Sequence, residues 1–103
     1  MMADEPEITV AELREASRRL LDAAERRLGS TVELQADTYW GLFAPEMFEQ
    51  DSPDVLERSL SDDVSEIRAL VSRPEDSFED DVMLWHDMNH LVGILQRVSA
   101  LTT

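Results

Sequence analysis

The apolar positions near the start of the chain recur at spacings of three and four residues, the period of one face of a helix. Thr9 with Glu12 forms a capping-box pattern, in which the hydroxyl and the carboxylate each satisfy a free backbone N–H. Gly29 follows as a natural stop, because glycine adopts a positive φ without a steric penalty. The pattern predicts a helix over 10–28. Its apolar stripe consists of Val10, Leu13, Ser17, Leu20, Leu21, Ala24 and Leu28.

A second segment with helical spacing follows in the middle of the chain. Ser61 is expected to cap it, and Asp62 and Asp63 fall in its first turn, where the positive end of the helix dipole favours carboxylates. Pro74 should end the helix near residue 72, because the residue before a proline avoids helical geometry. The predicted helix covers 61–72.

The last helix is predicted over 78–100, with Ser77 as its cap. Its apolar arc is wide, which is typical of a helix that packs against more than one neighbour. Trp85 and Met88 lie at the centre of the arc and are expected in the core. The polar side, which is expected to face solvent, holds His86, Asn89, His90, Gly93 and Arg97.

The segment 30–58 has no single period. Its residues 31–34 alternate in polarity, as in a short extended piece. A cluster of aromatic residues follows, interrupted by Gly41 and Pro45, so an irregular connection with short helical turns at 46–49 and 54–58 is expected. The aromatic residues, which are expected to fill the core of the small fold, with a partner-binding surface as the alternative, are Tyr39, Trp40, Phe43 and Phe48.

These elements predict an all-α fold, a small bundle of three principal helices with an aromatic-rich connection. The length fits one domain over 9–103, preceded by a disordered acidic tail at 1–8. The longest apolar runs are too short to span a bilayer.

The charge of the chain mainly excludes certain classes of binding partner. The chain contains 23 acidic residues, nine arginines and no lysine, so its formal net charge is -14. Sixteen of the acids lie in residues 30–103, with only four arginines. So acidic a chain repels nucleic-acid phosphates and anionic membranes. The absence of cysteine excludes disulfides and thiolate metal sites and fits the expected cytoplasmic location.

We therefore expect a non-enzymatic protein that binds a basic protein partner and needs no cofactor. Antitoxin, immunity and inhibitor proteins, including mimics of nucleic-acid charge, belong to this class. The wide apolar arc of the last helix also suits a two-fold homodimer. The residues expected to contact the partner are the acids Asp62, Asp63, Glu79, Asp80 and Asp81 and the aromatics Tyr39, Trp40 and Phe43.

A second hypothesis is a metal-dependent enzyme built on His86 and His90. Two histidines four residues apart share a helix face and can hold one zinc ion. Over these five residues the segment 86–90 resembles the zinc-peptidase motif, but Asp87 stands where that motif has a glutamate general base. The alternative is that both histidines only decorate a solvent-facing surface. A third hypothesis is a structural subunit whose acidity serves solubility.

Two short motifs carry a further resemblance. The sequence Asp37-Thr38-Tyr39-Trp40, a proline at position 53 and the sequence Ser59-Leu60-Ser61-Asp62-Asp63 resemble a pattern of uncharacterised small bacterial helical proteins. In that pattern an Asp-x-Tyr-Trp element precedes a Leu-x-Asp-Asp helix start. The resemblance spans about residues 10–100, and it implies a helical fold without a known activity.

Overall fold

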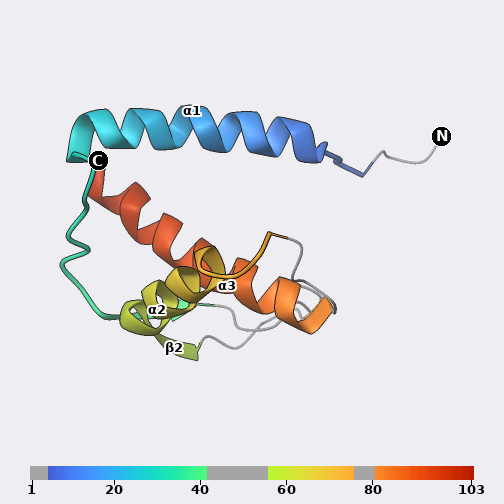
Figure 1. Ribbon diagram of the computed structural model, residues 1–103. Coiled ribbons are helices and arrows are strands. Elements are labelled where there is room, and N and C mark those ends of the chain that lie inside the picture. Colours follow the sequence, from blue (N-terminus) through green and yellow to red (C-terminus); the bar gives the residue numbers. More distant parts are fainter. Residues whose placement is uncertain (1–4, 42–55, 76–80) are drawn as a thin grey trace. The chain divides into compact units, whose positions relative to one another are not determined.

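The computed structural model describes residues 5–41, 56–75 and 81–103. The elements in chain order are α1 (Val10–Leu28), β1 (Thr38–Gly41), β2 (Leu56–Ser59), α2 (Leu60–Val71) and α3 (Asp81–Leu101) (Figure 1). The chain is mostly helical, as the sequence predicts. No helix within these ranges has the length and apolar character needed to cross a membrane.

The chain divides into two compact units. One is Met1–Val32 with Thr102, and the other is Glu33–Leu101 with Thr103. The first unit contains α1, and the second contains the two strands, α2 and α3. The packing of all three helices as one bundle, and of 9–103 as a single domain, stays a prediction.

Helix α1 has the predicted bounds and the predicted cap. The backbone N–H of Glu12 donates to Thr9 Oγ1 at 3.0 Å, and the backbone N–H of Thr9 donates to Glu12 Oε1 at 3.0 Å. Gly29 ends the helix with a φ of 90°. None of the residues of α1 is buried. The helix is therefore defined by its local sequence rather than by a covered apolar face.

The connection before α2 is more regular than its sequence suggests. Strands β1 and β2 pair antiparallel in the register Thr38↔Ser59 to Gly41↔Leu56. The helical turn expected at 54–58 is therefore wrong, and the turn expected at 46–49 lies outside the described residues. The extended piece expected at 31–34 is not a strand. Pairing with β2 selects Thr38–Gly41 instead, since strand formation depends on a partner more than on local propensity.

Helix α2 begins at Leu60 rather than after Ser61, because Ser59 is its cap. The Ser59 hydroxyl accepts from the backbone N–H of Asp62 at 3.3 Å. Asp37, just before β1, adds a second cap: its carboxylate accepts from the Ser61 backbone N–H at 2.9 Å and from the Ser59 hydroxyl at 3.0 Å. The hairpin and the start of α2 are thus joined by one carboxylate.

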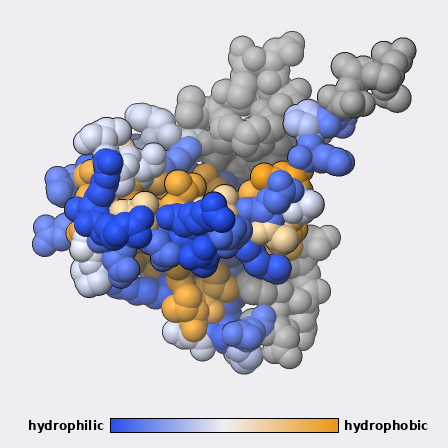
Figure 2. Space-filling model, turned by 90° about the horizontal axis from the view of Figure 1, so that it is seen from above, coloured by the Kyte–Doolittle hydropathy of each residue, from blue (hydrophilic) through white to orange (hydrophobic). Residues whose placement is uncertain are grey.

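Helix α3 begins at Asp81, and the cap expected at Ser77 lies outside the described residues. Its orientation is the reverse of the predicted one. Met88 is 58% exposed and Trp85 is half-buried, so the expected place of Met88 in the core is wrong. On the face of α1 shown in Figure 2, too, apolar side chains lie open at the surface between charged ones. The exposed apolar residues of α3 are Leu84, Met88, Leu91, Val92 and Leu95.

Candidate functional site

The polar stripe of α3 faces the interior of its unit, where α3 packs against α2. Its members His86, His90, Gly93 and Arg97 are spaced by four, three and four residues, so they share one face of the helix. Gly93 is buried, and the side chain of His90 is only 12% exposed. Arg97 Nε donates to the backbone oxygen of Leu34 at 2.6 Å. The expectation that this stripe faces solvent is therefore wrong for His90 and Gly93, whereas His86 keeps 39% of its side chain exposed.

Asp63 lies at the centre of this interior, at 1% exposure. Its carboxylate accepts a hydrogen bond from the Tyr39 hydroxyl at 2.5 Å and lies 2.6 Å from Nδ1 of His90. The Arg58 guanidinium, from β2, lies 3.4 Å away and supplies the opposite charge. A buried carboxylate needs such compensation, since removing a charge from water is costly. Asp63, which the sequence predicts to contact a partner, is thus buried inside the fold.

Tyr39 reaches this carboxylate from β1. Burial raises the pKa of its phenol, the hydrogen bond to Asp63 and the negative charge of that carboxylate raise it further, and Arg58 opposes these effects. The phenol therefore keeps its proton over the physiological range and acts as a donor. The Arg58 guanidinium lies 5.8 Å from the centre of the Tyr39 ring, within the range of a cation–π contact.

Gly93 allows this close approach. A Cβ at this position would lie 2.6 Å from Asp63 Oδ2 and closer still to the Tyr39 hydroxyl. Both contacts are too short for a carbon atom, so a larger residue would displace Tyr39 and Asp63 from α3. The lack of a side chain at Gly93 thus leaves room for Tyr39 and Asp63 to approach the helix.

Asp87 is the second buried carboxylate, at 3% exposure. It accepts from Arg73 Nη2 at 2.6 Å, and its other oxygen lies 3.5 Å from Nδ1 of His86. Each histidine of the pair therefore has a buried carboxylate on its Nδ1 side. The contact of Asp63 with His90 is short, and that of Asp87 with His86 is long.

The two histidines face each other through their other ring nitrogens. Nε2 of His86 lies 3.3 Å from Nε2 of His90, and the rings are inclined by 76°. A carboxylate only accepts hydrogen bonds, so the short contact with Asp63 assigns a proton to Nδ1 of His90 and leaves a lone pair on its Nε2, whereas the 3.5 Å contact of His86 with Asp87 is compatible with either tautomer of His86. With the proton of His86 on Nε2, the two rings share a hydrogen bond; with it on Nδ1, both Nε2 lone pairs face each other and can hold a metal ion between them.

Glu66 on α2 completes a group with metal-ligand geometry. One carboxylate oxygen of Glu66 and one nitrogen each of His86 and His90 lie within 4.8 Å of one another. Ligand atoms of a tetrahedral zinc ion are separated by about 3.3–3.4 Å, given Zn–N distances near 2.0–2.1 Å. The two Nε2 atoms, 3.3 Å apart, already have this separation. We call this set the Glu66–His86–His90 cluster.

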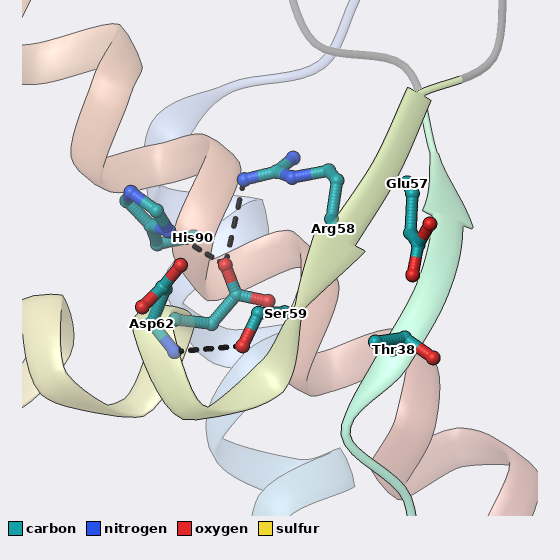
Figure 3. A pocket seen from close by; sticks show the side chains of 7 residues that line it. Thr38, Glu57, Arg58, Ser59, Asp62 and His90 are labelled. Carbon is teal, nitrogen blue, oxygen red and sulfur yellow. Dashed lines mark hydrogen bonds and ion pairs between the residues drawn. The ribbon is translucent and has the colours of Figure 1, made fainter.

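A surface pocket of about 550 Å³ adjoins the same network. Arg58 and His90 both contact Asp63, and in Figure 3 Glu57 leaves β2 on the opposite side from Arg58. Strand alternation explains this difference, because neighbouring residues face opposite sides of a sheet. The pocket lining consists of Thr38, Glu57, Arg58, Ser59, Asp62, Asp63 and His90.

The other residues expected to contact a partner are scattered. Asp62 is exposed, and Trp40 is 68% exposed. Phe43, Glu79 and Asp80 lie outside the described residues, and Asp81 is the first residue of α3.

Sequence reasoning missed the roles of Glu66, Arg58 and Arg73, which come from separate elements. One signal was present in the sequence: a mid-helix glycine, Gly93, on the same stripe as the histidine pair. Glycine within a helix costs about 1 kcal/mol relative to alanine, so its presence often indicates a close approach of another group.

No protein-family model, curated protein or solved structure matches this chain.

Proposed function

We propose that this protein binds a divalent transition-metal ion of the zinc class through the Glu66–His86–His90 cluster. The observation that carries the proposal is the pair of Nε2 atoms 3.3 Å apart, each on a ring whose Nδ1 faces a buried carboxylate. Histidine ligands of zinc almost always donate their second N–H to a carboxylate, a carbonyl or water, which fixes the tautomer and the ring.

The donor set selects the class of metal. Two imidazole nitrogens and one carboxylate are ligands that zinc accepts in three-ligand sites, and iron(II) uses the same set. Magnesium and calcium prefer oxygen ligands throughout, so a site with two imidazoles disfavours them.

Metal titration of purified, chelator-treated protein tests the proposal. Calorimetry should give one Zn²⁺ per chain, and His90→Ala should weaken binding by at least about 100-fold, more than the 10–100-fold typical of an outer-shell change. Gln96→Ala is the matched control, since this exposed residue lies on the same helix. Equal zinc affinity in His90→Ala and the parent would contradict the proposal and leave the two rings joined by a hydrogen bond.

A second candidate is the binding of a basic protein segment on the outer face of the hairpin. Trp40 is 68% exposed and stands opposite Glu57 in the strand register, and Glu57 is exposed as well. An exposed indole beside a carboxylate suits an arginine side chain, which stacks on the ring and pairs with the acid. The strongly acidic composition of residues 30–103 favours the same class of partner.

Fluorescence of Trp40 tests this candidate directly. In a Trp85→Phe background Trp40 is the remaining tryptophan, so its emission reports on this surface. An arginine-rich peptide should change the emission saturably, with weaker binding at higher salt because screening shortens electrostatic attraction to about 8–10 Å. A lysine peptide of equal charge is the control and should bind less well. An unchanged emission with both peptides would rule the candidate out.

A further inference from the structure

The Glu66–His86–His90 cluster supplies three ligands within the part of the chain that the structure describes. Zinc sites with a purely structural role have four protein ligands, whereas sites that act on other molecules have three and leave the fourth position to water or substrate. With three ligands from these residues, a tetrahedral ion in the cluster would have a fourth coordination position to fill.

The burial of the surrounding groups differs between the two sides of the cluster. The side chain of His86 is 39% exposed, and Glu66 is half-buried. The carboxylates behind the rings, Asp63 and Asp87, are 1% and 3% exposed. An ion in the cluster would thus have the two buried carboxylates on its inner side and the partly exposed His86 and Glu66 beside it.

The charge of the site indicates which kind of ligand this position favours. A divalent ion with the Glu66 carboxylate and two neutral imidazoles keeps one positive charge. Two more carboxylates lie behind the histidines, at Asp63 and Asp87. Each has an arginine beside it, Arg58 at 3.4 Å and Arg73 at 2.6 Å, which offset their charge. The ion and its three ligands together therefore carry one positive charge, which favours an anion as the next ligand.

We propose that the ion keeps one coordination position open to solvent and binds a small anion there, of the class of hydroxide or carboxylate. This inference rests on the proposed function, because it needs the ion to be bound. It gives the metal a role in binding or activating another molecule rather than only in holding α2 against α3.

Cobalt(II) loading followed by azide titration tests the inference. Cobalt(II) replaces zinc in such sites, and its visible absorption reports the number and type of ligands. Azide is a monodentate anion and serves as the probe, with sodium perchlorate at the same ionic strength as the control. We expect the cobalt bands to shift saturably with azide, at one azide per metal, and to stay unchanged with perchlorate.

The proposed metal site and its open coordination position are ruled out by different results. If the protein takes up no cobalt, the proposed metal site itself is wrong. If cobalt binds but azide leaves the bands unchanged, the fourth position is filled by the chain and the inference is overturned. Equal shifts with azide and perchlorate would also overturn it, because they would reflect ionic strength and not coordination.

Discussion

Asp63 is the residue on which the buried polar network of the second unit depends. Its carboxylate contacts groups from three other elements: Tyr39 on β1, Arg58 on β2 and His90 on α3. Such a residue links the stability of the fold to the geometry of the candidate metal site. A change here should therefore affect both, whereas a change at an exposed neighbour should affect neither.

Asp63→Asn should lower the free energy of unfolding by about 1–3 kcal/mol, because an amide cannot accept all three contacts and a buried donor loses its partner. It should also weaken zinc binding about 10–100-fold, since the ring of His90 is no longer held in one orientation. Urea unfolding and metal titration measure the two effects.

Asp62→Asn is the matched control, because Asp62 is the adjacent residue in the same helical turn and is exposed. It should change stability by less than about 0.5 kcal/mol, as surface substitutions usually do. Equal effects at the two positions would mean that the burial of Asp63 has no energetic importance.

At the scale of elements, the second unit is organised by two contacts of the hairpin. One joins it to α3 through Tyr39 and Gly93, and the other joins it to α2 through Asp37. Both contacts use polar groups, and both bring together residues that are far apart in the sequence. Each can be tested by a single substitution.

Gly93→Ala should destabilise the protein by about 1–3 kcal/mol, the usual cost of overpacking, although alanine is the better helix former. The reason is the clash of a Cβ with the Tyr39 hydroxyl and Asp63. In a Tyr39→Phe background the closest clashing atom is absent, so the same substitution should cost less. A double-mutant cycle by chemical denaturation measures the difference, and strict additivity would show that Tyr39 does not contact this position.

Asp37 gives the start of α2 a dependence on pH. The backbone N–H of Ser61 and then the hydroxyls of Ser61 and Ser59 lower the pKa of Asp37 below its ordinary value of 3.8. A lowered pKa in the folded state means that the carboxylate stabilises the fold above pH 3.8 and loses this effect as the pH falls towards the lower value.

Asp37→Asn should therefore melt at a lower temperature than the parent at neutral pH, and the difference should shrink as the pH falls below 3.8. Thermal melts followed by circular dichroism at several pH values provide the comparison. A difference that is independent of pH would mean that the effect of Asp37 comes from the shape of its side chain and not from its charge.

The sequence predicts those elements that depend on local signals. Helix α1 has the expected bounds because Thr9, Glu12 and Gly29 act within a few residues of the helix ends. The hairpin was missed because Thr38–Gly41 becomes a strand only through its pairing with Leu56–Ser59. The inner face of α3 was assigned to solvent because its polar residues have partners that no local pattern reveals: Asp63 lies 27 residues from His90. The pairing of the histidines was predicted as an alternative, and the carboxylates behind them were not.

At the scale of the whole molecule, the described apolar side chains are more exposed, and several polar ones more buried, than the sequence predicts. The buried residues of the second unit include two carboxylates, while α1 and α3 each present an exposed apolar stripe. Because monomeric proteins rarely expose large apolar patches, such stripes often indicate contact surfaces. The consequence for solution behaviour can be measured without knowing any partner.

The double variant Met88→Gln and Leu95→Gln should reduce the binding of a hydrophobic dye to the folded protein and leave stability within about 1 kcal/mol, because both side chains are exposed. Leu60→Gln is the contrasting variant. Leu60 is 2% exposed, and a buried unsatisfied amide should destabilise the fold strongly. Severe destabilisation by the double variant would mean that these side chains are covered in the solution state.

A polar interior also affects how the protein responds to temperature. Exposure of apolar surface raises the heat capacity on unfolding by about 0.45 cal/K/mol per Å², and exposure of polar surface lowers it by about 0.26. Among the described residues the fully buried set is Leu60, Asp63, Asp87 and Gly93. The heat-capacity change of this unit should therefore fall below the usual 12–15 cal/mol/K per residue. A small heat-capacity change reduces the curvature of free energy against temperature, so the protein should lose little stability on cooling.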